Sequence, residues 1–250
     1  MKTVTDGLVI KEMSIGEADK LITILTKDDG IVKAYASGVK SIKSKRSVGT
    51  TLLSYSNFSF SKSGKNLRVS EATPIKNFFS TDNDIETFAI SQYFCELCAV
   101  FEPHEETAPE FLRLILNSLY FLKEKKKSPL MIKAITELRI AAKSGYCPNL
   151  VACEECGAFE DEIMFFNCEN GAIQCKNCNK SEKNVPLNKT LLKAMRHIVY
   201  SPFERLYSFS VPDEAAKELS KITERYITYQ TDRSFKTLDF LHTVYLESET

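Results

Sequence analysis

The first part of the chain alternates apolar and polar residues with a period of two, which is the pattern of half-buried β-strands. Val, Ile, Thr, Tyr and Phe are frequent in these segments, and Gly, Asp, Asn and Ser separate them. The pattern predicts five short strands, at residues 4–10, 20–26, 31–36, 51–61 and 66–73. After Pro74 the apolar spacing changes to the period of helices.

Two features of the strand region favour a closed shape. Residues 27–30 read Lys-Asp-Asp-Gly, a short hairpin loop between two predicted strands. From Tyr55 onward the apolar parity shifts, so we expect a bulge near Ser56-Asn57, and a bulge bends its strand. Five short, bent strands in about 80 residues predict a small barrel of the OB-fold type.

Helices are predicted at residues 84–101, 109–123, 129–144, 187–200 and 212–230. The first places five residues near one apolar stripe: Ile85, Phe88, Ala89, Tyr93 and Leu97. Gly145 follows the third helix as a C-terminal cap. The predicted fold class is therefore α+β and multidomain, with an OB-fold barrel at 1–80 and a helical domain at 81–250.

Residues 146–186 interrupt the helices and contain two cysteine pairs, each with two residues between its members. The pairs are Cys153 with Cys156 and Cys175 with Cys178. Two thiolates in a tight turn can bind one metal ion from one side, and a second such turn completes a tetrahedron. A predicted hairpin, Glu162–Cys168 out and Ala172–Gln174 back, brings the two turns together. We therefore predict one structural zinc ion in an insert at about 148–184, because four thiolates leave no open coordination position.

The remaining cysteines have other interpretations. Cys95 and Cys98 share the two-residue spacing but lie within a predicted helix, so we expect them in the core as small apolar residues. Cys168 lies in the hairpin at the wrong spacing for a ligand, and Cys147 is only a minor candidate. A redox role is the weaker alternative, because two matched pairs around a hairpin are not a thioredoxin-like arrangement.

The formal net charge of zero conceals an uneven distribution. Residues 1–80 contain 13 Lys and Arg against 7 Asp and Glu, a net of +6, so the remaining 170 residues carry −6. Eight basic residues and no acidic one fall within 31–70: Lys33, Lys40, Lys43, Lys45, Arg46, Lys62, Lys65 and Arg68. A basic module of this kind indicates binding to a polyanion, although a solvated basic loop is the alternative.

Aromatic residues lie among these cations. Proteins that bind single strands combine a cationic groove with aromatic side chains on which bases stack. Alternation places Lys33 and Tyr35 on one face of a predicted strand, so Tyr35 joins the eight cations as the predicted DNA-binding set. Phosphate contacts carry no base code, and binding should be largely independent of sequence. Tyr55, Phe58 and Phe60 are further stacking candidates, but we expect core packing for at least two of them.

No catalytic constellation is recognisable. The three His residues are not paired at ligand or triad spacing, and no glycine-rich phosphate loop follows a predicted strand. No apolar run reaches the roughly 18 residues of a membrane span, and the first residues lack the apolar core of a signal peptide. We expect a cytoplasmic protein that is not an enzyme and does not bind membranes, with its cysteines reduced or metal-bound.

Fragments along almost the whole chain match, in order, the pattern of a known family. The N-terminal fragments are Gly7-Leu8-Val9-Ile10, Gly16-Glu17-Ala18-Asp19, Leu25-Thr26, Gly30, Ala36-Ser37-Gly38-Val39-Lys40 and Ser44-Lys45-Arg46. The later fragments are Glu137-Leu138-Arg139, Gly145-Tyr146-Cys147-Pro148-Asn149-Leu150 running into Cys153 and Cys156, and Phe235-Lys236-Thr237-Leu238-Asp239-Phe240-Leu241. Together with the cysteine insert, they resemble the RecO family of bacterial DNA repair and recombination mediators. The family's usual Ala-Lys-Gly reads Ala36-Ser37-Gly38 here, which removes one cation from the loop.

The resemblance implies an N-terminal OB-fold and a helical domain with a zinc-finger-like insert. It implies binding to single- and double-stranded DNA, annealing of complementary strands without ATP and, with RecR, loading of RecA onto strands coated by the single-strand-binding protein SSB. It further implies a nucleoid-associated protein whose helical domain binds the acidic, apolar tail of SSB. The candidate cations for that tail are Arg139, inside a matched fragment, and Arg113, Lys133 and Lys143, chosen by position. Ordinary ion pairs are the alternative for each.

Two other functions stay open. One is an adaptor whose barrel and zinc ribbon bind proteins and no DNA. A salt titration of single-strand binding separates that adaptor from a mediator. The other is a zinc-ribbon enzyme with an unrecognised site, which requires a deep polar pocket.

Overall fold

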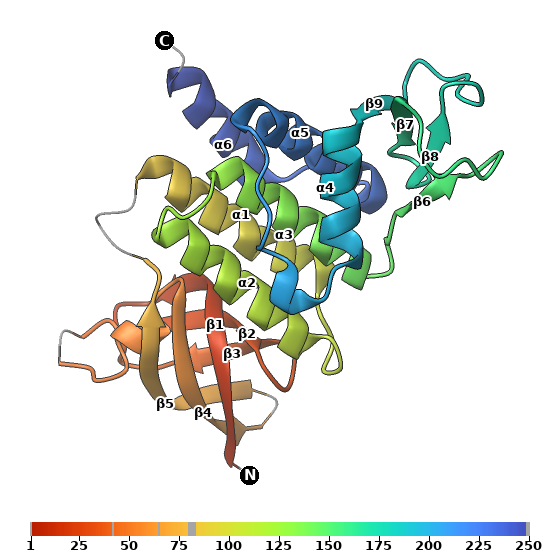
Figure 1. Ribbon diagram of the computed structural model, residues 1–250. Helices are drawn as coiled ribbons and strands as arrows, with labels where there is room; N and C mark the ends of the chain where they lie inside the picture. The colour runs from red at the N-terminus through yellow and green to blue at the C-terminus, as the bar shows by residue number, and fades with distance from the viewer. Residues whose placement is uncertain (1, 42, 65, 80–83, 249–250) are drawn as a thin grey trace. The chain divides into compact units, whose positions relative to one another are not determined.

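The computed structural model describes residues 2–41, 43–64, 66–79 and 84–248 (Figure 1). By its internal contacts the chain divides into two compact units. The first unit comprises Met1–Glu124 and Phe235–Thr250, and the second comprises Lys125–Ser234. The division at residue 80 stays a prediction.

The first unit begins with a closed five-stranded barrel (Figure 1). Its strands are β1 (Lys2–Ile15), β2 (Asp19–Thr26), β3 (Ile31–Ala36), β4 (Ser54–Ser63) and β5 (Asn66–Asn77), with the short 3₁₀ turn η1 (Val48–Thr50) before β4. Their order is β1-β2-β3-β5-β4, and β4 pairs antiparallel with β1. A parallel pairing of β3 with β5 completes the ring. The predicted barrel is therefore confirmed.

Apolar side chains fill the barrel. The core residues are Val9, Ile22, Ile24, Ala34, Ala36, Val39, Phe58, Phe60, Val69 and Ala72. The rings of Phe58 and Phe60 stack with centroids 5.7 Å apart, so these two aromatic residues belong to the core, as expected. The register of β4 against β5 shifts between Tyr55 and Ser56, close to the expected bulge. Such shifts bend the strands and let a short sheet close on itself.

Three helices belong to the first unit: α1 (Ile85–Phe101), α2 (Ala108–Lys123) and α6 (Lys236–Ser248). Asp84 caps α1, because its Oδ1 accepts a hydrogen bond of 2.7 Å from the backbone N–H of Thr87. The residues of the predicted apolar stripe differ in exposure. Ile85 is the first residue after the cap and is 56% exposed, whereas the buried face of α1 begins at Thr87.

Helix α6 was not among the predicted helices. Its first turn is held by a carboxylate from another helix, because Glu96 of α1 accepts hydrogen bonds from the backbone N–H groups of Lys236 (3.3 Å) and Thr237 (3.0 Å). Tyr93 of α1 packs edge-on against Phe235, with ring centroids 5.5 Å apart. A helix start that depends on a partner 140 residues away leaves no local capping signal in the sequence.

The second unit consists of a small sheet and three helices. The strands are β6 (Asn149–Cys153), β7 (Ile163–Asn167), β8 (Ala172–Cys175) and β9 (Val185–Asn188), and the helices are α3 (Pro129–Lys143), α4 (Lys189–Tyr200) and α5 (Asp213–Thr231), with the 3₁₀ turn η2 (Phe203–Arg205) between the last two. Gly145 follows α3 with a φ of +90°, a conformation that favours glycine and ends the helix. The backbone N–H of Tyr146 then reaches back to the carbonyl of Ala141 at 2.9 Å.

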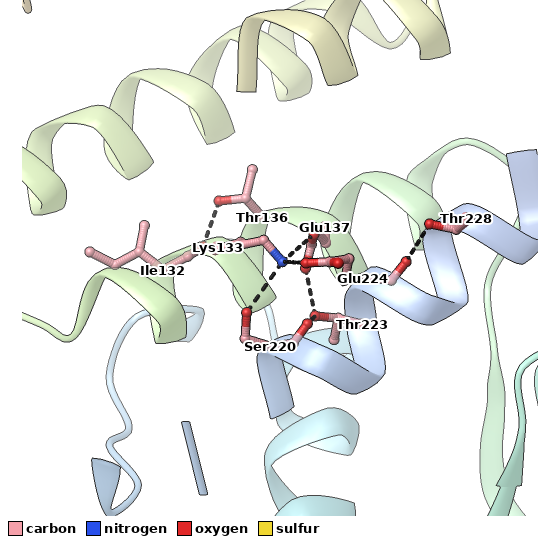
Figure 2. Close-up of polar contacts among 8 residues, drawn as sticks. All are labelled: Ile132, Lys133, Thr136, Glu137, Ser220, Thr223, Glu224 and Thr228. Atoms are coloured by element: carbon pink, nitrogen blue, oxygen red, sulfur yellow. Dashed lines mark hydrogen bonds and ion pairs between the residues drawn. The ribbon is translucent and has the colours of Figure 1, made fainter. Parts of the chain in front are cut away.

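A buried charge cluster joins α3 to α5 (Figure 2). The ammonium of Lys133, whose side chain is 1% exposed, lies 2.9 Å from Glu137 and 2.8 Å from Glu224, and it donates to the hydroxyl of Ser220 at 3.2 Å. Thr223 donates a hydrogen bond of 2.6 Å to the other oxygen of Glu137. Burial raises the pKa of the Glu137 carboxyl, and the charge of Lys133 and the hydroxyl of Thr223 oppose that shift.

We expect Lys133→Met to lower the free energy of unfolding by about 3–5 kcal/mol at pH 7, because it leaves Glu137 buried without a counter-charge. Chemical denaturation of the purified protein measures this change. The loss should shrink as the pH falls towards 4.5, the ordinary pKa of a glutamic acid, because a protonated Glu137 needs no cation. In the folded variant the pKa of Glu137 is raised further, so stability is present at low pH and is lost as pH rises through that pKa.

Lys133→Met combined with Glu137→Gln should recover much of the loss. Lys143→Gln, at an exposed position of the same helix, serves as the control. A loss below about 1 kcal/mol for Lys133→Met would show that the cluster is not what holds α3 to α5.

Candidate metal centre and nucleic-acid interface

The four predicted ligands gather at one edge of the small sheet, whose strand order is β6-β8-β7-β9. Cys153 ends β6 and Cys175 ends β8, and each is followed by a turn that carries the second cysteine of its pair. β6 and β8 pair in parallel, so their carboxyl ends meet at the same edge. The predicted hairpin is present as the antiparallel pair β7 and β8.

The geometry of this cluster fits a tetrahedral metal ion. The four Sγ atoms, of Cys153, Cys156, Cys175 and Cys178, all lie within 4.8 Å of one another. Those of Cys156 and Cys175 are 3.7 Å apart. Four sulfurs each about 2.3 Å from a central ion in a tetrahedron are separated by roughly 3.8 Å. The site is therefore a candidate metal centre of four thiolates.

The electrostatics of the cluster reflect its crowding. Burial raises the pKa of the Cys153 thiol, but hydrogen bonds from the backbone at Cys156, Cys175 and Glu155 outweigh burial and lower it to about 6. Hydrogen bonds with the sulfurs of Cys175 and Cys156 instead raise the pKa of Cys178 to about 12. Ionising one thiol therefore disfavours ionising the next one.

The other cysteines lie elsewhere. Cys95 and Cys98 are buried in α1, where burial raises both thiol pKa values, that of Cys95 to about 12. Burial also raises the pKa of Cys168 to about 11. Neither Cys147 nor Cys168 belongs to the metal-ligand group found among the described residues. All eight cysteines lie among the described residues, and none of them forms a disulfide bond.

The outer face of the barrel carries a row of neighbouring side chains. Met13 of β1 pairs with Leu21 of β2, Leu21 pairs with Tyr35 of β3, and Tyr35 pairs with Arg68 of β5. Met13, Tyr35 and Arg68 are exposed. The row thus joins an apolar surface, an aromatic ring and a cation, and we call it the barrel row. Sequence reasoning missed Met13 and Leu21, although apolar residues at the outward parity of a strand were the available signal.

The predicted DNA-binding cations fall into different environments. Lys40 donates to the carbonyl of Gly16 at 2.8 Å, and Arg46 donates to the carbonyls of Val69 (2.7 Å) and Ser37 (2.8 Å). These two side chains hold the loop after β3 to the barrel. Lys43, Lys45 and Lys62 are exposed, as is Arg68 of the barrel row. The predicted residue Lys65 lies outside the described residues.

Lys33 is exposed but faces carboxylates. It lines a hollow of about 790 Å³ together with four acidic residues, Asp29, Glu102, Glu105 and Glu106. Carboxylates near a cation reduce the potential that it presents to a phosphate, and a phosphate contact at Lys33 stays a prediction. Tyr55 is partly buried and its hydroxyl lies 3.5 Å from Asp6, so its ring is not part of the barrel row.

The predicted partner-binding cations also separate into two kinds. Lys133 lies inside the cluster of Figure 2. Arg139 is buried and donates to the carbonyls of Ile198 (3.0 Å) and Val199 (2.8 Å), where a cation suits the negative end of α4. Arg113 and Lys143 are exposed, in the first and second unit respectively. Lys133 and Arg139 therefore have structural roles that leave little side chain for a peptide.

The fold defines a class of protein with three parts. A small barrel of the type that often binds nucleic acid is joined to a set of helices, and the helices carry an insert with four clustered cysteines. Two family models match the chain: "Recombination protein O N terminal" over residues 1–78 and "Recombination protein O C terminal" over residues 82–239. The DNA repair protein RecO of Acetivibrio thermocellus is 32% identical over 241 residues, covering 96% of each chain. That of Caldicellulosiruptor bescii is 29% identical over 236 residues, covering 94% of this chain and 96% of its own.

The chain belongs to the RecO family. This membership assigns it to DNA repair and recombination, and neither family description names a catalytic activity. Within the described part of the chain, no helix combines the length and apolar character needed to cross a bilayer.

We expect Cys175→Ser to prevent metal binding at the cysteine cluster and to loosen residues 150–185 while sparing the barrel. Metal binding by four thiolates is coupled to folding, with apparent free energies of about 10–16 kcal/mol in small zinc-finger peptides. Elemental analysis gives the metal content, and hydrogen exchange followed by mass spectrometry locates the loosening.

Cys147→Ser is the control, since this cysteine is exposed and outside the cluster. A metal content near zero in carefully prepared native protein contradicts the prediction. A disulfide between Cys153 and Cys156 does so too.

Proposed function

We propose that this protein is a DNA-binding recombination mediator that binds single and double strands on its barrel and anneals complementary strands without ATP. The observation that carries the proposal is the barrel row, in which the exposed ring of Tyr35 lies between an apolar surface and the Arg68 guanidinium. OB-folds bind oligonucleotides on the face of their second and third strands, and the row crosses this face. Family membership supports the same role.

The chemistry of the row favours a single strand of any sequence. Bases stack on Tyr35 whatever their identity, because every base has a π-face. Lys43, Lys45, Lys62 and Arg68 are exposed cations that can pair with phosphates, and such contacts position the strand without reading bases. Annealing needs two strands held without base-specific contacts, so that the bases stay available to each other.

The ion of the cysteine cluster is zinc in this proposal. A tetrahedral set of four sulfurs is typical of zinc or of iron–sulfur centres, and the paired spacing around a hairpin favours zinc. Cys153, Cys156, Cys175 and Cys178 would hold it. With no open position its chemistry is structural, and it would tie β6 and β8 to their turns.

The protein partners follow from the resemblance: RecR, the C-terminal tail of SSB and, indirectly, RecA. An acidic, apolar tail needs an apolar groove with a cation at its rim. The exposed residues Arg113 and Lys143 are the retained candidates for that cation.

We expect the combined change of Lys43, Lys45, Lys62 and Arg68 to Gln to weaken binding to all sequences about equally. On single strands each lost phosphate contact should reduce the log–log salt slope by roughly 0.7. Tyr35→Ala should weaken single-strand binding while leaving that slope almost unchanged, because stacking releases no counterion. Fluorescence anisotropy with labelled oligonucleotides at several salt concentrations measures both, and annealing of complementary oligonucleotides without ATP measures the activity.

The matched control changes four exposed lysines of the second unit, Lys189, Lys193, Lys217 and Lys221, to Gln. Lys40 and Arg46 are left intact because their loss would release the loop they hold. Unchanged affinity and slope in the barrel variant would mean that these cations are only solvated. Absence of DNA binding at low salt would favour a protein adaptor instead.

We expect Arg113→Gln or Lys143→Gln to reduce the affinity of the full chain for an SSB tail peptide, and high salt should reduce it as well. Removing the terminal apolar residue of the peptide should also weaken binding. Isothermal titration calorimetry measures each change. Binding that depends on Lys43 and Lys45 instead would refute the assignment, since simple attraction to the basic barrel would then explain it.

A further inference from the structure

A second hollow lies within the second unit, between the end of the cysteine insert and α5. Its volume is about 530 Å³. It is lined by Asn167, Cys168, Glu169, Lys180, Ser181, Glu182, Lys183, Asn184, Arg225 and Tyr229. An adjoining hollow of about 440 Å³ shares Asn167, Lys180, Ser181 and Asn184 and continues to Asn177 and Cys178. We call the first of these the insert hollow.

The lining of the insert hollow is mainly polar and charged. It combines an aromatic ring, two amides and three cations, and among the described residues that form it none is aliphatic. Tyr229 is 45% exposed although it lies on a helix whose other aromatic residue in this region, Tyr226, is buried. Three cations against two carboxylates leave the lining with a net charge of +1.

The walls of the hollow are held by hydrogen bonds. Arg225 lies over the ring of Tyr229, 5.6 Å from its centroid, and donates to the carbonyl of Lys183 at 3.1 Å. Asn184 is buried, and its amide nitrogen donates to Asn179 at 2.8 Å. Gln230, next to Tyr229 on α5, donates to the carbonyls of two further lining residues, Cys168 (2.9 Å) and Glu169 (3.0 Å). The hollow is therefore organised before any ligand arrives.

We propose that the insert hollow is a second contact site for single-stranded nucleic acid, separate from the barrel, in which one base stacks on Tyr229. Lys180 and Lys183 would contact the adjacent phosphates, and the amides of Asn167 and Asn184 line the space beside the base. Stacking on an aromatic ring next to cations is the general way in which proteins bind single strands. The inference rests on the proposed function, since it presumes a DNA-binding protein.

The lining argues against a peptide as the occupant. An acidic, apolar peptide gains affinity by burying its apolar side chains, and none of the described lining residues is a Val, Leu, Ile, Met or Ala that would receive them. The low net charge also makes a specific prediction. Binding at Tyr229 should depend less steeply on salt than binding at the barrel, because few counterions are released there.

The test uses the whole 250-residue chain and a labelled oligothymidine. We expect Tyr229→Ala to lower the affinity about 5- to 10-fold, at the lower end of the cost of one base–aromatic stack, and Tyr229→Phe to retain wild-type affinity. Ultraviolet crosslinking to an oligothymidine that contains 5-iododeoxyuridine should place adducts on Tyr229 as well as on Tyr35. Lys180→Gln with Lys183→Gln should weaken binding more than the control pair Lys217→Gln with Lys221→Gln on the exposed face of α5.

The results for Tyr35→Ala, Tyr229→Ala and the wild type distinguish a failure of the second site from a failure of the proposed function. If Tyr35→Ala weakens binding and Tyr229→Ala does not, and adducts form only on Tyr35, the barrel binds DNA and the second site is refuted. If neither variant nor wild type binds DNA, the proposed function itself fails. If thymidine monophosphate binds as tightly as the oligomer, and if Tyr229→Ala abolishes that binding, the occupant of the hollow is a free nucleotide and the proposal of a nucleic-acid strand is wrong. Displacement of the oligomer from Tyr229 by an acidic peptide would overturn it in favour of a protein partner.

Discussion

The parallel pairing of β3 with β5 is the contact on which the arrangement of the barrel depends. Every other pair of neighbouring barrel strands is antiparallel. Without the parallel pair the five strands would form an open sheet with two unpaired edges. Unpaired edge strands can pair with other chains and lead to aggregation. The same pair places Tyr35 beside Arg68. The contact that closes the barrel therefore also forms part of the proposed binding face.

The insert repeats this logic on a smaller scale. β6 and β8 are parallel, and this brings two cysteine turns from different parts of the sequence to one sheet edge. An antiparallel pair would have placed the two turns at opposite ends. A bound ion would add a further constraint at the cysteine ends of these two strands, because metal binding is coupled to folding.

Some cations of this protein have structural roles and others are available to a partner, and the two groups differ in their exposure to solvent. Arg46, Lys40 and Arg139 donate to backbone carbonyls, and Lys133 neutralises buried carboxylates. These side chains stabilise loops and helix packing. The exposed lysines at residues 43, 45 and 62 are, by contrast, accessible to an anionic partner without disturbing the fold.

The sequence by itself determined the features that depend on local pattern. The strand periodicity, the Asp-Asp-Gly turn and the paired spacing of the cysteines can each be recognised from neighbouring residues, because each depends on contacts within a few positions. Only the tertiary structure decided which cations form internal ion pairs and hydrogen bonds. Lys133 and Glu224, for example, are 91 residues apart in the sequence and pair in the folded protein. The tertiary structure likewise determined three further features: the contact of Glu96 with the first turn of α6, the barrel row from Met13 to Arg68, and the exposure of Ile85. Each of these depends on which elements pack together, and one chain's pattern of apolar and polar residues is compatible with several such packings.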